Sequence, residues 1–460
     1  MIRWSGLLIW FGPFWVFGCG GTGSGVNDRD AAVDLLPAEV RSDQARTGDD
    51  GGPPSDLGVP VDAGYHGSGR AFPDTSARIA ILADQLPGGL TMAQQQFVVT
   101  HYVGTQKLTL DLSKPLRALN PAFLVLHYHL ANWQSAPGVS FITDGRTWSN
   151  DYPAVSQHES WFWHNQSAQR VASNVDGKLL MNLADPGFRQ YWADSLARQT
   201  EAGDYDGIFA DSASPALLNF EAQRPPEPRL QATGVKDTKI AEWGDRTYVE
   251  VWQEWIAALD ATLAAQGIPL IPNTSAFVTT WDTTRYDLTA GAFVEGFASP
   301  RFSTADWKAS TNQLLKLAAR GKIIILQNYL SATTDTATRT YYLANYLLVK
   351  GGRTYLDYFA KSPLEWYPEW GVDLGTALNT GMTVDDLLVG GVYRREYQRG
   401  AALVNPTGAP VTVVVGAGLG VLGMTGGGGV PADGTTPGVI TKTAAQTIVV
   451  PAYGAAIFVK

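Results

Sequence analysis

The sequence predicts an α/β fold, namely a (β/α)8 TIM barrel followed by a small C-terminal antiparallel β-sandwich. Two observations support this prediction. Between about residues 78 and 385, short β-prone runs alternate with stretches of helical periodicity, which is typical of βαβ units around a parallel sheet. After about residue 388, β-prone runs are separated by Gly and Pro, which is typical of short antiparallel strands.

Composition narrows the class of function. The chain has 460 residues, enough for two or three domains, and 45% of them are hydrophobic, so a large core is possible. The formal net charge of −9 argues against a nucleic-acid partner, because phosphate binding needs basic patches. The 15 Trp, 18 Tyr and 17 Phe residues suit the stacking of sugar rings, although aromatic side chains also fill cores.

Residues 1–19 are typical of an export signal, with one early basic residue, a short apolar run and small residues after it. The end of this segment, Val16-Phe17-Gly18-Cys19, resembles a bacterial lipobox. Cys19 is the only cysteine, so no disulfide can form within the chain. We therefore expect lipid on Cys19 and a bacterial cell-envelope location, either anchored at the outer membrane or extracellular. The alternative is a plain secretory signal with a chance cysteine.

The rest of the chain divides by composition. Residues 20–72 are rich in Gly, Asp, Pro, Ser and Ala and predict a disordered linker, because they bury little apolar surface. Residues 73–387 are expected to form the barrel, and residues 388–460 the β-sandwich. We expect a monomer.

Eight β-prone runs are the expected barrel strands: Ile79–Ala83, Phe97–Val103, Phe123–His129, Gly207–Asp211, Pro269–Asn273, Gly291–Glu295, Ile323–Asn328 and Thr354–Asp357. Helices are expected at Phe188–Glu201, Tyr248–Gln266, Trp307–Arg320 and Thr336–Val349. The β-sandwich strands are expected at Gly400–Asn405, Val411–Val415, Gln446–Val450 and Ala455–Val459. The long connection from Leu130 to Tyr205 is expected above the C-terminal ends of the barrel strands.

Two carboxylates stand at expected strand ends, where (β/α)8 enzymes carry their active sites. Asp211 ends the fourth strand and Glu295 ends the sixth. Two carboxylates facing one cavity are what glycoside cleavage requires, because one protonates the leaving oxygen and the other attacks the sugar or activates water. The structural alternatives are that Asp211 caps a helix and that Glu295 pairs with a cation such as Arg301.

Other polar residues at strand ends suit sugar hydroxyls, although each could be structural. The expected substrate-binding residues are Asp84, His129, Asn182, Asn273, Gln327, Asn328 and Asp357, with Trp161 and Trp163 as sugar platforms. Asn182 lies close to Asp185-Pro186, which also predicts a helix start.

A metal site was weighed at His127 and His129, which alternate onto one face of a strand. Further ligands are hard to name, and the sequence has neither a Gly-rich phosphate loop after a strand nor a Gly-x-Ser-x-Gly motif. We expect no metal and no cofactor.

The segment Asp206-Gly207-Ile208-Phe209-Ala210-Asp211 resembles that of glycoside-hydrolase-like barrels near the α-galactosidase superfamily. Similar families are the hypothetical glycosyl hydrolase-like family fifteen and the endo-α-1,4-polygalactosaminidases, and the resemblance covers about residues 78–385. It implies an α-linked substrate, Asp211 as the nucleophile and Glu295 as the acid/base. α-Galactosidases carry a Lys two residues before the nucleophile, and Phe209 stands at that position here. This difference argues against α-galactosidase activity itself.

The expected function is therefore a retaining glycoside hydrolase that cleaves a poly- or oligosaccharide. Two alternatives stay open at this point. One is a non-catalytic carbohydrate-binding barrel, and the other is a metal-dependent deacetylase or amidohydrolase.

Overall fold

The computed structural model describes residues 66–460, apart from residues 136–141, 144–145, 148–150, 174–176, 214–222, 225–238, 275–286, 301 and 362–363. The expected signal, Cys19 and most of the expected linker lie outside the described residues. Within the described part of the chain, none of the helices combines the length and the apolar character needed to cross a bilayer.

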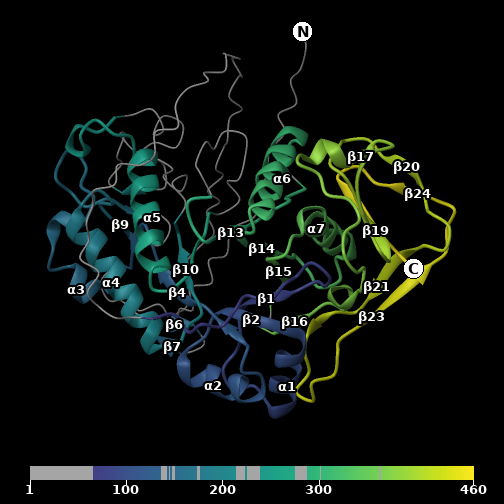
Figure 1. Cartoon of the computed structure of the whole chain (residues 1–460), viewed down its shortest axis with the longest axis horizontal. Coiled ribbons are helices and arrows are strands. Elements are labelled where there is room, and N and C mark those ends of the chain that lie inside the picture. Colours follow the sequence, from purple (N-terminus) through teal and green to yellow (C-terminus); the bar gives the residue numbers. More distant parts are fainter. Residues whose placement is uncertain are drawn as a thin grey trace, which may run out of the picture.

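The centre of the molecule is a curled parallel sheet that closes on itself (Figure 1). Its strands in chain order are β1 (Ile81–Gln85), β2 (Tyr102–Lys107), β3 (Leu124–Val125) running on into β4 (His127–Leu130), β10 (Ile208–Asp211), β12 (Leu270–Pro272), β13 (Gly291–Glu295), β14 (Ile323–Tyr329) and β15 (Thr354–Phe359). One run of pairings joins β13, β14, β15, β1, β2 and β3, and a second joins β4, β10 and β12. A parallel bridge between Asn273 and Phe293 connects β12 to β13, which completes the ring.

Helices cover the outside of this ring. They are α1 (Met92–His101), α2 (Leu110–Leu119), α4 (Pro186–Ala202), α5 (Tyr248–Ala264), α6 (Thr304–Ala319) and α7 (Thr336–Val349). The four helices expected from periodicity are present, each within three residues of its expected bounds. In the described residues, none follows β12, and β15 leads instead to β16 (Glu365–Trp366) and the 3-10 helix η6 (Pro368–Gly371).

The second expected strand, Phe97–Val103, was wrong. Residues 92–101 form α1, and the strand begins only at Tyr102. The helix start carries a capping box, in which Thr91 caps the backbone N–H of Gln94 and the Gln94 side chain returns to Thr91. The capping residues are visible in the sequence, and they start a helix although the residues that follow are β-prone.

The interior of the ring is apolar up to the last inward position of each strand. Alternation points every second side chain inward. The buried inward cluster includes Leu82, Phe209, Ile271, Phe293, Ile325 and Tyr355. Two residues further along the same strands stand Asp84, Asp211, Asn273, Glu295, Gln327 and Asp357. The strands therefore bring a set of polar side chains to one end of the barrel, above an apolar plug.

The opposite end of the barrel is covered by residues before β1. Arg70 forms ion pairs with Asp204 and with the buried Asp206, and the ring of Phe72 packs edge-on against Tyr355 with 5.9 Å between centroids. Residues 67–72, which were expected to belong to the linker, are therefore attached to the barrel floor.

The C-terminal region forms a six-stranded antiparallel sheet in the order β17-β18-β19-β25-β21-β23. The bounds are β17 (Leu388–Val389), β18 (Val392–Tyr397), β19 (Gly400–Asn405), β21 (Gly420–Thr425), β23 (Val439–Thr443) and β25 (Gly454–Val459). A ribbon of β20 (Val411–Val414) and β24 (Thr447–Val450) packs on one face through a buried apolar cluster. The other face lies on α7, where the Tyr397 hydroxyl donates to the carbonyl oxygen of Leu347 at 2.6 Å.

A buried ion pair links α7 to the segments around it. Arg339 donates from Nε to Glu369 Oε1 at 2.8 Å, and both side chains are completely buried. Tyr358 also donates to Glu369 Oε1, at 2.7 Å. Arg339 Nη1 donates to the carbonyl oxygen of Gly426, so the pair connects the barrel to the C-terminal sheet.

Candidate active site

Asp211 and Glu295 meet at one side chain. The amide nitrogen of Asn273 donates to Asp211 Oδ1 at 2.8 Å and to Glu295 Oε2 at 2.9 Å. These two distances sum to 5.7 Å, so the two carboxylate oxygens lie no further apart than that. Both acidic residues are partly exposed, whereas Asn273 is buried. The structure thus places the two acids predicted from sequence side by side at the open end of the barrel.

Asp211 is held at both oxygens. The Tyr128 hydroxyl donates to Oδ2 at 2.6 Å, and the backbone N–H of Ser212 donates to Oδ1 at 2.8 Å. Ser212 has φ of 53°, in the left-handed region that a non-glycine residue adopts only at a cost. Asp211 caps no helix in the described chain, because residues 212 and 213 are not helical. The carboxylate is therefore fixed in place by three donors and has no structural task in a helix.

Glu295 accepts hydrogen bonds from two neutral side chains. Besides Asn273, it accepts a hydrogen bond from the Tyr329 hydroxyl at Oε1, at 2.6 Å. The next residue, Gly296, has φ of 78°, so the chain turns away immediately after the acid. Arg301, the partner considered from sequence, lies outside the described residues.

The environments shift the pKa values of the two acids in opposite directions. Burial alone would raise the pKa of Asp211, but Lys178, Lys107 and the hydrogen bonds from Tyr128 and Asn273 together lower it. Burial raises the pKa of Glu295, and the negative charge of Asp211 raises it further. The arrangement favours an ionised Asp211 beside a protonated Glu295, which is the division of roles that acid-assisted nucleophilic displacement needs.

Lys107 supplies positive charge at the end of β2. Its ammonium group lies 2.8 Å from Asp84 Oδ1 and 5.1 Å from the ring centre of Tyr128. Burial would lower the pKa of Lys107, but the nearby charges of Asp84, Asp211 and Glu295 raise it above its usual value. A permanently charged Lys107 stabilises negative charge on both acids.

Other residues expected in the site form its supporting layer. The Asp84 backbone N–H donates to Asp357 Oδ2 at 2.7 Å, and burial raises the pKa of Asp357 well above its usual range. Gln327 is buried and donates from Nε2 to the Tyr329 hydroxyl at 3.1 Å. Asp84, Gln327 and Asp357 thus lie at the barrel mouth with the two acids.

His129, which was expected to bind substrate, lies in the helix layer. Its ring contacts Asp151, with Nε2 2.8 Å from Oδ2, and packs edge-on against Trp192 of α4. His127 contacts Thr200 of the same helix. Alternation along β4 turns both histidines to the helix layer and turns Tyr128 into the barrel. No group of three or more His, Cys, Asp or Glu side chains in the described residues is arranged to hold a metal ion.

Asn328 was also expected to bind substrate. It points away from the barrel mouth, where its amide donates to the carbonyl oxygen of Phe297 at 2.7 Å. Its neighbours in sequence, Gln327 and Tyr329, face the acids. Alternate residues of a strand point to opposite faces of the sheet, so Asn328 lies on the other face.

The expected sugar platforms, Trp161 and Trp163, and the expected substrate-binding residue Asn182 pack the long connection between β4 and α4. Trp161 is 8% exposed and stacks on His158, and Trp163 is 5% exposed and packs on Trp243. Asn182 accepts a hydrogen bond from the indole N–H of Trp243 and donates to the carbonyl oxygen of Ser160. Asp185 caps α4, as its sequence context indicated.

Sequence reasoning missed Tyr128, Lys107 and Tyr329. Tyr128 and Tyr329 are each adjacent in sequence to a residue that was considered. Lys107 ends β2, whose bounds were misplaced. The signal was the inward and outward alternation along β4 and β14, which a known strand register makes readable.

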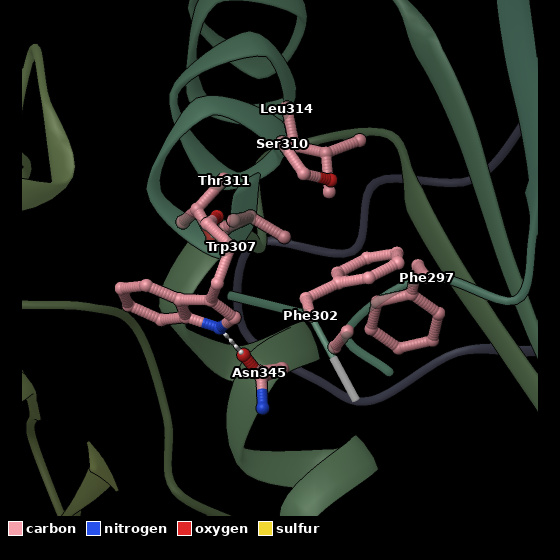
Figure 2. Close-up of a pocket in the computed structure, with 9 residues that line it drawn as sticks. Phe297, Phe302, Trp307, Ser310, Thr311, Leu314 and Asn345 are labelled. Carbon is pink, nitrogen blue, oxygen red and sulfur yellow. Dashed lines mark hydrogen bonds between the residues drawn. The ribbon is translucent and has the colours of Figure 1, made fainter. Parts of the chain in front are cut away.

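A separate pocket lies between the end of β13, α6 and α7 (Figure 2). Its lining includes Phe297, Phe302, Trp307 and Asn345, and the Trp307 indole N–H donates to Asn345 Oδ1 at 2.7 Å. The volume open to the centre of a water molecule is about 10 Å³, which is room for about one water. A sugar ring does not fit there.

Comparison with solved structures gives general likenesses to carbohydrate-active enzymes. A noncanonic maltogenic α-amylase from Thermotoga neapolitana is 11% identical, with a TM-score of 0.42 over 83% of this chain and 99% of that one. A trehalulose synthase mutant in complex with sucrose is 8% identical, with a TM-score of 0.45 over 84% of this chain and 98% of that one. At such low TM-scores these likenesses say nothing about substrate or mechanism.

No curated protein matches the sequence. The model of the hypothetical glycosyl hydrolase family 15 matches residues 117–401, which is more than half of the chain and includes Asp211, Asn273 and Glu295. The chain belongs to the hypothetical glycosyl hydrolase family 15.

Proposed function

We propose that the protein is a retaining glycosidase that cleaves an α-linked poly- or oligosaccharide, with Asp211 as nucleophile and Glu295 as acid/base. The observation that carries the proposal is the bridge of Asn273 between the two carboxylates. Membership of a glycosyl hydrolase family supports glycosidase activity in general.

In the first step, Asp211 attacks the anomeric carbon while Glu295 protonates the glycosidic oxygen that leaves. The lowered pKa of Asp211 and the raised pKa of Glu295 suit these roles. The donors Tyr128, Asn273 and Ser212 hold the attacking carboxylate in one orientation, which reduces the cost of reaching the reactive geometry.

In the second step, Glu295 has lost its proton and takes one from water, which attacks the anomeric carbon and releases Asp211. Retention needs carboxyl groups about 5–5.5 Å apart, whereas inversion needs about 6.5–9.5 Å to admit water between them. The limit of 5.7 Å between the two bridged oxygens supports retention.

The α linkage is the narrower part of the proposal. It is supported by the resemblance of the segment from Asp206 to Asp211 to the strand-four motif of enzymes near the α-galactosidase superfamily.

The test is a hydrolysis screen over α- and β-linked glycans and glycosyl fluorides, with Asp211→Asn and Glu295→Gln beside the wild type. We expect both variants to lose at least about a thousandfold in kcat/KM on the best glycan. Glu295→Gln should retain much more activity on the fluoride, because fluoride leaves with little acid assistance. NMR of the first-formed product reports the anomer. The mechanism would be overturned if the first product had the inverted anomeric configuration, or if Asp211→Asn kept full activity.

We also propose that Cys19 carries lipid and holds the protein at the bacterial cell envelope. The support is the lipobox-like Val16-Phe17-Gly18-Cys19 and the acyl chains that such processing supplies. Radiolabelled palmitate should enter the wild type and not Cys19→Ser. Labelling of both proteins, or of neither, would remove the proposal.

A further inference from the structure

Tyr329 combines a buried attachment with an open face. The residue is 41% exposed to solvent, although its hydroxyl donates to Glu295 Oε1 at 2.6 Å. Gln327 donates to the same hydroxyl, and the Tyr329 ring packs edge-on against Phe359 with 5.1 Å between centroids. The ring is therefore held by Phe359 and by the hydrogen bonds of its hydroxyl, while part of the residue stays open to solvent.

The position of this ring follows from the order of the strands. Asp211 and Glu295 end β10 and β13, and Asn273 directly follows β12. Tyr329 ends the next strand, β14. Tyr329 therefore lies beyond Glu295 as seen from Asp211. In the proposed reaction the sugar that is attacked lies over Asp211, and the sugar that leaves is bonded to the oxygen that Glu295 protonates.

We propose that the ring of Tyr329 forms the binding subsite for the leaving-group sugar. The proposal rests on the proposed glycosidase function and names the ligand class of one part of the site. The flat CH face of a sugar ring packs on an aromatic ring that is held rigid and open on one side. The hydroxyl of the same residue positions Glu295, so the leaving sugar and the acid that protonates its oxygen are aligned by one side chain.

The two contributions of Tyr329 are separable by substitution. Tyr329→Phe removes the hydroxyl and keeps the ring, whereas Tyr329→Ala removes both. Comparing these two variants isolates the ring, because both have lost the hydrogen bond to Glu295. Tyr453→Ala is a matched control, because Tyr453 is 46% exposed in the C-terminal region and far from the acids in sequence.

Two substrates separate sugar binding from bond cleavage. One is the best α-linked disaccharide or oligosaccharide from the hydrolysis screen, whose leaving group is a sugar. The other is the glycosyl fluoride of the same attacked sugar, whose leaving group does not reach the subsite. Thermal unfolding of each variant reports whether the fold is intact.

We expect kcat/KM on the glycan to be about tenfold lower in Tyr329→Ala than in Tyr329→Phe, with the loss mainly in KM. On the fluoride the two variants should agree within about twofold, and Tyr453→Ala should match the wild type on both. Equal losses on glycan and fluoride, or no difference between Phe and Ala on the glycan, would overturn the subsite. If the wild type turns over neither compound, the proposed function itself fails.

Discussion

Lys107 and Asp84 form an ion pair at the mouth of the barrel, with Nζ 2.8 Å from Oδ1. Their side chains are 17% and 16% exposed, so solvent screens the charges only partly. The same ammonium group lies over the ring of Tyr128, whose hydroxyl holds Asp211. One cation from β2 thus influences a pair of acids that stand on β10 and β13.

Replacing Lys107 with Met should shift the pH profile of kcat/KM upward at both limbs. The positive charge lowers the pKa of Asp211 and of Glu295, so its removal raises both. Asp211 must be ionised for the reaction, so its raised pKa moves the acid limb of the profile to higher pH. Glu295 must be protonated, so its raised pKa moves the alkaline limb to higher pH. Lys107→Arg keeps the charge and is the control. A Met profile that superimposes on the wild type would show that the charge does not reach the acids.

Replacing Asn273 with Ala should lower kcat/KM about a hundredfold, because one preorganised donor to each acid is lost. Asn328→Ala is the matched control. It removes an amide from β14, where the side chain donates to the carbonyl oxygen of Phe297 and not to either acid. In the control, the free energy of unfolding should fall by about 1 kcal/mol, and most of kcat/KM should be kept. Similar kinetic losses in the two variants would argue against a special role for the bridge.

Replacing Arg339 with Met should destabilise the protein by about 3–5 kcal/mol, because Glu369 would be left as a buried charge without its cation. The control is Arg399→Met, since Arg399 pairs with Asp373 at the surface with 45% and 68% of the side chains exposed. An exposed pair contributes less than about 1 kcal/mol. Urea unfolding measures both, and equal midpoints would contradict the prediction.

His127 should make the protein sensitive to acid. Burial, with a smaller effect of His129, lowers the pKa of His127 from 6.5 to about 3. Between these values the unfolded chain binds the proton and the folded chain does not, so stability falls as pH falls from 6.5 toward 3. The fall is up to about 1.4 kcal/mol per pH unit from this residue. His127→Gln should flatten this part of the stability curve, and an unchanged slope would show that His127 is not responsible.

The parallel strands were predictable because their burial leaves long apolar runs in the sequence. The parallel strand Gly291–Glu295 was placed at its observed bounds, and so were the antiparallel strand Gly400–Asn405 and the helix Thr336–Val349. Asp211, Asn273 and Glu295 followed from one rule, that inward residues at strand ends form the site.

The rest depended on which face each side chain takes. A strand buried on both faces has apolar residues at every position, so its sequence does not show which residues point inward. The sequence therefore did not show that His129 and Asn328 turn away from the acids, or that Tyr128 and Tyr329 turn toward them. The burial of Trp161 and Trp163 had another cause, because exposed and buried tryptophans look alike in sequence and only the packing against His158 and Trp243 distinguishes them.

Arg70 and Phe72 attach the chain to the end of the barrel opposite Asp211 and Glu295. A mechanical load applied ahead of residue 66, as in a single-molecule pulling experiment, would therefore enter the barrel at its floor. It would act first on contacts such as the Arg70–Asp206 ion pair and not on the strand ends that carry the two acids.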